Sequence, residues 1–252
     1  MSAAYGGSNL LNKNRKLIDY SALATQTAYV FMYVASHADF LAQVFAKADS
    51  VDALTPLKQE EVRVTSMGGG PGSDLLALVQ TIRLMPAEVR PRRIHYRVLD
   101  KQPNWHEILQ TVAIQQRGTI HIELSFERMD VTVPEQWQGM STENDDLLIM
   151  NFFVSEVCKL READSVRKCL KKALKNMKKE SIVVFNDNNF PSCFEYFDHR
   201  SASAGNFSRS VSESSRLNAE PSFDDFFREC MDRFERTPKL TSNAAYRVLR
   251  RL

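Results

Sequence analysis

The chain has 252 residues, of which 43% are hydrophobic and 25% are charged, and its formal net charge is +2. This is the composition of a globular protein that can bury a substantial core. No run of about 18 uncharged apolar residues occurs, so no segment is a candidate membrane span. The N-terminus also lacks a secretory signal pattern. We therefore expect an intracellular protein of the cytoplasm or nucleus, with no membrane partner.

Metal-ligand residue types and net charge indicate no function by themselves. The four cysteines form no C-x-x-C pair, and the five histidines follow no metal-ligand spacing. A zinc ribbon and a dithiol redox motif are therefore excluded, and no metal is expected. The small net charge does not indicate a nucleic-acid partner, so the distribution of basic residues matters more.

The N-terminal quarter of the chain is predicted to be helical. Apolar residues follow helical spacing over Leu17–Ala48, without an internal proline or glycine. We predict a flexible N-terminus over 1–16, a helical lead-in over 17–60 and a core over 61–252. The whole chain is predicted to be a single domain.

Strands and helices are predicted to alternate through the core. The predicted strands are Val62–Met67, Ile94–Leu99, Ile120–Phe126, Leu147–Met150, Ile182–Phe185 and Ala245–Leu252. The predicted helices are Ser73–Met85, Asn104–Gln116, Ser165–Lys179 and Phe223–Phe234. Such alternation favours an α/β fold with a doubly wound, mostly parallel sheet flanked by helices, for which we expect seven strands. The serine-rich stretch near 200–221 is predicted to be a mobile loop.

The run Gly68-Gly69-Gly70-Pro71-Gly72 joins the first core strand to a helix that opens with Ser73-Asp74. Glycine lets the backbone turn tightly and approach a ligand, and a helix N-terminus can receive an anionic group. A phosphate-binding P-loop is excluded because Asp74 stands where lysine is needed, and Ser73 breaks the dinucleotide pattern. A tight turn without a ligand remains an alternative.

The segment Met67-Gly68-Gly69-Gly70-Pro71-Gly72-Ser73-Asp74 resembles the first motif of the class I S-adenosylmethionine-dependent methyltransferases, which have a Rossmann-like fold. By this resemblance the glycine loop lies against the methionine part of the cofactor, Asp100 binds its ribose, and Asp130 with Met129 meets its adenine. The resemblance thus implies S-adenosyl-L-methionine as cofactor. The residues expected to bind it are Gly68, Gly69, Gly70, Gly72, Asp74, Asp100, Met129, Asp130 and Asn151.

The methyl acceptor is less well indicated. Asn151 is the candidate catalytic residue, because its amide could orient an acceptor, but a strand-end turn is an equal alternative. No residue identifies itself as a general base. Tyr20 and Tyr29 are expected in the core, although by the resemblance to the family their segment can also close over the cofactor. Basic clusters make an RNA acceptor possible, although a solvated outer face is the favoured interpretation of the largest cluster. The glycine-proline-glycine loop resembles that of some fungal proteins that methylate ribosomal RNA, and this resemblance implies ribosomal RNA as a possible acceptor. A small-molecule or protein acceptor, an unknown protein partner, and a non-catalytic cofactor sensor or partner subunit stay open. The clusters are Lys13, Arg15, Lys16; Arg90, Arg92, Arg93; Arg167, Lys168, Lys171, Lys172, Lys175, Lys178, Lys179; and Arg247, Arg250, Arg251.

Overall fold

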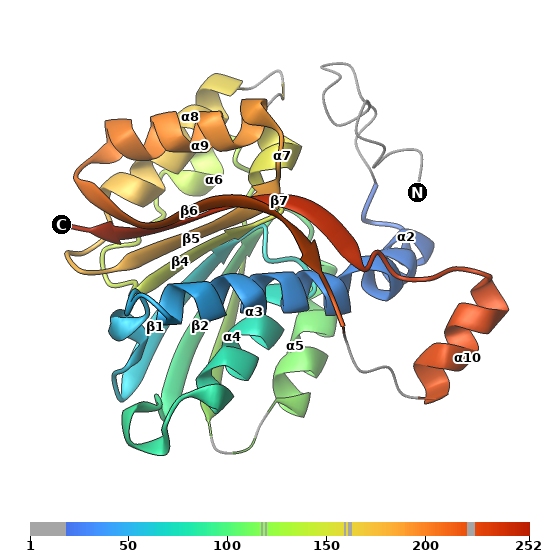
Figure 1. The fold of residues 1–252 in the computed structure, drawn as a ribbon. Coiled ribbons are helices and arrows are strands. Elements are labelled where there is room, and N and C mark those ends of the chain that lie inside the picture. Colours follow the sequence, from blue (N-terminus) through green and yellow to red (C-terminus); the bar gives the residue numbers. More distant parts are fainter. Residues whose placement is uncertain (1–18, 117, 119, 159, 161–162, 221–224) are drawn as a thin grey trace.

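The computed structural model describes residues 19–252 except 117, 119, 159, 161–162 and 221–224. Seven strands form one sheet in the order β3-β2-β1-β4-β5-β7-β6, with helices on both faces (Figure 1). Strands β1 to β5 run parallel, and β7 is antiparallel to both of its neighbours. The predicted doubly wound α/β fold is therefore confirmed. The strands are β1 Glu61–Met67, β2 Arg93–Asp100, β3 His121–Arg128, β4 Leu147–Asn151, β5 Ile182–Asn188, β6 Phe207–Asn218 and β7 Thr241–Arg251.

The helices form two layers (Figure 1). One face of the sheet is covered by α3 Ala35–Asp49, α4 Ser73–Leu84 and α5 Trp105–Gln115. The other face carries α6 Pro134–Trp137, α7 Val154–Val157, α8 Ala163–Lys175 and α9 Pro191–Ala204. Helices α2 Leu23–Tyr29 and α10 Asp225–Phe234 lie together beside one end of the sheet. Short 3-10 turns occur at η2 Thr55–Leu57 and η3 Ala87–Val89.

Strand β4 shows why its apolar run forms a central strand. Successive side chains point to opposite faces of a sheet. Leu147 and Ile149 belong to the core beneath α3 to α5, whereas Leu148 and Met150 belong to the core beneath α6 to α9. A strand that is buried on both faces needs apolar residues at every position, as the sequence analysis predicted.

The predicted helix Leu17–Ala48 is present from Leu23 onward but is not uniform, and residues 19–22 before it are not helical. Helix α2 passes at Val30 into a π-helical turn, η1 Val30–Val34, and then into α3. π-helical turns are wider than an α-helix and often occur at functional sites. The flexible N-terminus predicted over 1–16 lies outside the described residues.

The prediction of a mobile loop near 200–221 is wrong. Its first residues end α9, and the following residues form β6, which pairs with β7 from Phe207 to Asn218. Only Val211 and Leu217 of this edge strand are buried. The backbone ladder to β7 therefore holds most of β6 in place, and exposed edge strands commonly carry polar side chains. A search for apolar alternation cannot recognise such a strand.

Candidate functional site

The five parallel strands all end at the same edge of the sheet. The chain leaves β1 toward β2 on one side, and β4 lies on the other side, so the strand order reverses between β1 and β4. A crevice forms at such a switch point in open α/β sheets. The glycine loop follows β1 at this position, so the loop lies where a ligand site is expected.

Three glycines of the loop have a left-handed backbone. The φ angles of Gly68, Gly70 and Gly72 are +69°, +47° and +105°, which residues with a Cβ rarely adopt. A Cβ at Gly68 would lie 2.4 Å from Cδ2 of Phe153, and one at Gly72 would lie 2.9 Å from Cδ1 of Leu109. The packing of the protein itself therefore requires glycine at these two positions.

Gly70 differs because space opens beside it. A Cβ there would have Nε1 of Trp105 at 3.8 Å and Oδ2 of Asp100 at 3.9 Å as its nearest side-chain atoms, which is ordinary contact. The Gly70 N–H donates to Oδ2 of Asp100 at 2.9 Å, and the Gln102 N–H donates to Oδ1 at 2.8 Å. A carboxylate has about four lone-pair directions, so Asp100 keeps acceptor capacity. Burial raises the pKa of Asp100 to about 6, and the group is still mostly ionised at pH 7.

Asp74 lies behind the loop and holds the strand ends together. Its carboxylate accepts hydrogen bonds from Oγ of Ser66 at 2.5 Å and from Nδ2 of Asn151 at 2.8 Å. Oδ1 of Asn151 in turn accepts a hydrogen bond from Nδ2 of Asn186 at 2.8 Å. Burial raises the pKa of Asp74 to about 6. The Asn151 amide is thus engaged on both sides by the protein, which leaves it little freedom to orient an acceptor.

The residues after β3 close another side of the site. Oδ2 of Asp130 lies 2.9 Å from Nζ of Lys101, and its Oδ1 accepts hydrogen bonds from the backbone and hydroxyl of Thr132. The Met129 N–H donates to the carbonyl of Asp100 at 2.9 Å, and the Met129 side chain is buried. The apolar side chain of Met129 and the ion pair between Asp130 and Lys101 therefore line the same pocket as Asp100.

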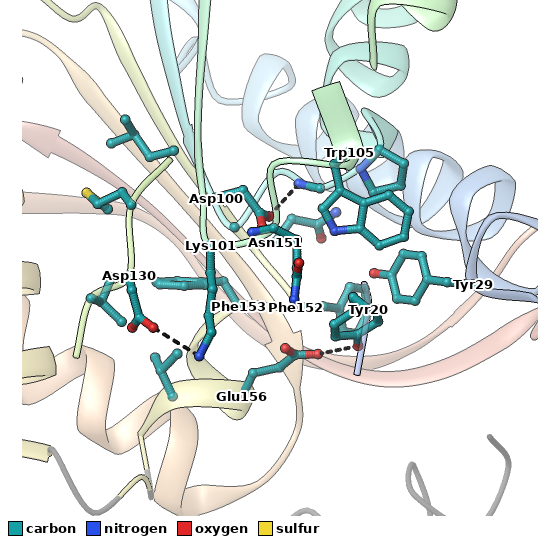
Figure 2. A pocket seen from close by; sticks show the side chains of 18 of the residues that line it. Tyr20, Tyr29, Asp100, Lys101, Trp105, Asp130, Asn151, Phe152, Phe153 and Glu156 are labelled. Atoms are coloured by element: carbon teal, nitrogen blue, oxygen red, sulfur yellow. Dashed lines mark hydrogen bonds and ion pairs between the residues drawn. The ribbon is translucent and has the colours of Figure 1, made fainter. Parts of the chain in front are cut away.

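The aromatic side chains of Tyr20, Tyr29 and Trp105 gather on one side of the site, as Figure 2 shows. The ring centroid of Tyr20 lies 5.5 Å from that of Tyr29 and 5.8 Å from that of Trp105, and the last two lie 5.5 Å apart. The Tyr20 hydroxyl donates to Oε1 of Glu156 at 3.3 Å. The two tyrosines expected in the core thus border the site. Trp105 was not singled out from the sequence, although it begins the helix that follows Asp100.

These groups line one cavity of about 160 Å³, which we call the main pocket. Six of the nine residues expected to bind a cofactor line it: Gly68, Gly70, Asp100, Met129, Asp130 and Asn151. The other three, Gly69, Gly72 and Asp74, pack behind it against protein atoms. The remaining lining residues include Tyr20, Tyr29, Pro71, Leu99, Lys101, Gln102, Trp105, Val131, Phe152, Phe153, Glu156, Val157 and Leu160.

None of the basic residues noted in the sequence that the structure describes lines the main pocket. Nζ of Lys178 lies 2.6 Å from Oδ1 of Asp146, directly before β4, whereas Asn151 at the other end of that strand lines the pocket. Arg247 is buried, and its guanidinium binds Asp198. The far edge also carries Arg92, Arg93 and Arg250, each paired with a glutamate. Lys13, Arg15 and Lys16 lie outside the described residues.

Two classes of site find no support in the described part of the chain. No described group of three or more His, Cys, Asp or Glu side chains could hold a metal ion. Among the same residues, no helix is both long enough and apolar enough to cross a membrane. The chemistry of the site therefore has to be read from the main pocket.

Comparisons with known proteins give structural matches only. No protein-family model matches the sequence, and a search of curated proteins found no similar sequence. The CurJ carbon methyltransferase structure is 13% identical, with a TM-score of 0.50, over 91% of this chain and 58% of its own. A SAM-dependent methyltransferase from Methanosarcina mazei is 10% identical, with a TM-score of 0.49, over 80% and 97% of the two chains. An arsenic(III) S-adenosylmethionine methyltransferase from Chlamydomonas reinhardtii is 13% identical, with a TM-score of 0.46, over 76% and 64%.

The chain spans less than two thirds of the CurJ and Chlamydomonas structures, and the likeness to CurJ concerns the fold. The dinucleotide-binding order 3-2-1-4-5-6 has only parallel neighbours, whereas here the antiparallel β7 lies between β5 and β6. The likeness shows that the chain shares a Rossmann-like α/β fold with the CurJ carbon methyltransferase structure.

Proposed function

We propose that the main pocket binds S-adenosylmethionine and that the protein transfers its methyl group to a small-molecule acceptor. The observation that carries this proposal is the convergence at the switch point of an open glycine, Gly70, and a buried carboxylate with spare acceptor capacity, Asp100. The fold supports a methyltransferase, and these two residues support the cofactor.

The residues present fit the cofactor. Paired ribose hydroxyls need a carboxylate that can accept two further hydrogen bonds, which Asp100 offers beside Gly70. Met129 and Asp130 would meet the adenine, as the resemblance to the family implies. The cofactor also carries a positive sulfonium, which aromatic faces and a carboxylate attract. The ring of Tyr20 and the carboxylate of Glu156, which are hydrogen-bonded to each other, provide these two groups at one wall of the pocket.

The bound cofactor would supply a methyl group made electrophilic by its sulfonium, and in-line attack by an acceptor lone pair leaves S-adenosylhomocysteine. The protein contributes positioning and exclusion of water, which can account for much of such an acceleration. The network of Asp74, Asn151 and Asn186 fixes the floor of the pocket rather than moving a proton. We assign no general base in the main pocket.

The acceptor is proposed to be small because of where the charges lie. An RNA acceptor needs positive charge near the pocket mouth to bind phosphates. Lys178 and Arg250 lie instead at the opposite edge of the sheet, in ion pairs with acidic side chains. The RNA expectation from the sequence thus gains no support from these residues.

The experiment that tests this function is a transfer assay. The full chain is incubated with methyl-labelled S-adenosylmethionine and with the RNA, protein and small-molecule fractions of a cell extract, each in turn. We expect label to move into the small-molecule fraction with equimolar S-adenosylhomocysteine. Asp100→Ala should lose this turnover, and Lys58→Met, a change far from the pocket, should keep it.

Two results would contradict the proposal. Label in RNA or protein would refute the small acceptor while keeping the methyltransferase. Tight cofactor binding without transfer to any fraction would instead favour a non-catalytic sensor or a partner subunit.

A further inference from the structure

A smaller cavity adjoins the main pocket, and we call it the second pocket. Its volume is about 30 Å³, which is room for one or two water-sized groups. Tyr29, Phe152 and Glu156 line both pockets, so the two share a wall. The residues that line only the second pocket are Tyr33, His37, Ser155, Asn188 and Lys239. The shared wall is formed partly by Phe152, which follows β4 at the carboxyl edge of the sheet.

The second pocket is built on one face of the N-terminal helix. Tyr29, Tyr33 and His37 are spaced four residues apart across the π-helical turn. Their ring centroids follow one another at 5.2 Å and 5.3 Å. Residues at this spacing share a helix face. The widened turn therefore lies where the helix supplies side chains to both pockets.

His37 presents an unpaired nitrogen here. Its side chain is 6% exposed, and its ring stacks on Phe152 with the centroids 4.0 Å apart. Its Nε2 is buried and has no hydrogen-bond partner. Burial, helped by the charge of Lys239, lowers the pKa of His37 to about 3, so the ring is neutral. A buried polar atom without a partner costs about 1 to 3 kcal/mol, which a ligand that pairs with it would recover.

Lys239 brings a positive charge to the same pocket. Its backbone N–H donates to the carbonyl of Met32 at 3.0 Å, which ties this segment to the N-terminal helix. Its Nζ lies 5.6 Å from the ring centroid of Phe152 and forms no salt bridge with any described residue. Burial lowers the pKa of Lys239, and nearby Asp187 acts in the opposite sense. A partly buried ammonium without a salt bridge favours an anionic ligand.

The acidic side chains around the second pocket are occupied elsewhere. Glu156 accepts a hydrogen bond from Tyr20 at the cofactor end. Asp187 is buried and accepts hydrogen bonds from the backbone N–H groups of Ser155 and Asn188. The charge of Lys239 is therefore left for a ligand.

We propose that the second pocket is the oxygen-binding end of the acceptor subsite and that it recognises an oxyanion, the ionised oxygen of a small phenol, enol or carboxylic acid, whose remaining atoms lie toward the main pocket. Lys239 binds this oxygen, and Nε2 of His37 donates a hydrogen bond to it. This inference rests on the proposed function, because methyl transfer requires the acceptor oxygen to meet the methyl group of the cofactor at the boundary that Tyr29, Phe152 and Glu156 form between the two pockets.

The test uses the full chain with S-adenosylhomocysteine and with 4-nitrophenol, whose ionised form absorbs visible light. Calorimetry first measures S-adenosylhomocysteine binding by the wild type, Lys239→Met, His37→Phe and Lys58→Met. The last is the matched control, a partly buried lysine outside both pockets, paired with Asp49. We expect all four proteins to bind S-adenosylhomocysteine with affinities within about two-fold of each other, since none of these side chains lines the main pocket.

4-Nitrophenol is then added to the saturated complex about one pH unit below its pKa in water, where about a tenth of it is ionised. We expect the wild type to bind it as the phenolate, with a saturating rise in absorbance. Lys239→Met should weaken binding at least about ten-fold and remove the rise, because the charged partner is lost. His37→Phe should weaken it by a smaller factor, and Lys58→Met should match the wild type.

The possible failures are distinguishable. If the wild type binds S-adenosylhomocysteine but does not bind the phenol, or binds only its neutral form, this inference is overturned and the proposed function stands. The same holds if Lys239→Met titrates like the wild type. If the wild type does not bind S-adenosylhomocysteine at all, the proposed function fails, and this inference fails with it.

Discussion

Asp100→Ala is the substitution whose effect on cofactor binding follows most directly from the structure. Oδ1 and Oδ2 of Asp100 each accept a backbone hydrogen bond and keep further acceptor capacity in the main pocket. If the ribose hydroxyls use that capacity, their loss should cost about 1.5 to 3 kcal/mol, the range for hydrogen bonds to a charged group. The dissociation constant of S-adenosylhomocysteine should then rise about 10- to 150-fold.

Alanine also releases the backbone N–H groups of Gly70 and Gln102, so the ribose contribution has to be isolated. A double-mutant cycle does this by calorimetry with S-adenosylhomocysteine and its 2′,3′-dideoxy analogue. The wild type should lose affinity for the analogue, whereas Asp100→Ala should bind both ligands alike. If the analogue costs the variant as much as it costs the wild type, Asp100 does not bind the ribose, and the placement of the cofactor is refuted.

Three further predictions concern the loop, the buried acid and a buried ion pair. Gly70→Val places a branched side chain at a φ of +47° between Asp100 and Trp105, so S-adenosylhomocysteine affinity measured by calorimetry should fall at least about ten-fold in a folded protein; normal binding would contradict this. Burial raises the pKa of Asp74 from 3.8 to about 6, so the stability that its protonated form contributes is complete below about pH 4 and is lost as the pH rises through about 6. Burial also raises the pKa of Asp100, so Asp74→Asn keeps part of the pH dependence. In urea unfolding, the loss should be smaller in Asp74→Asn than in the wild type by the order of 3 kcal/mol, and parallel pH profiles would be inconsistent with it. Arg247→Met leaves Asp198 without its buried partner and should lower the free energy of unfolding by about 2 kcal/mol, whereas the exposed Arg209→Met should change it by less than about 1 kcal/mol; equal effects would argue against the pair.

The sequence predicts the parallel part of the fold well because burial dictates its pattern. Strands covered on both faces, such as Leu147–Asn151, need continuous apolar residues, and the helices between them need one apolar face. The sequence also predicts that polar residues at or just after the strand ends lie close together, since parallel strands end at one edge of the sheet. For this reason Asp100, Asp130 and Asn151 line the same pocket although they are far apart in the chain.

The remaining features depend on contacts that leave a weak local signal. The edge strand β6 is stabilised by backbone pairing, so its serines resemble a loop. Helix α9 begins with Pro191, a residue that favours the first helical turn, but its single buried face is short. Tyr20 and Tyr29 have the spacing of core residues, and only the path of the N-terminal helix brings them to the pocket. The role of Asp74 behind the loop likewise depends on its contact with Asn151.

The central claim is that the main pocket binds S-adenosylmethionine, and one measurement tests it most directly. The purified full chain is titrated calorimetrically with S-adenosylmethionine, and with NAD as a nucleotide that shares the adenosine part. We predict micromolar binding of S-adenosylmethionine with one site per chain and no binding of NAD. No binding of S-adenosylmethionine, or equal binding of NAD, would contradict the account.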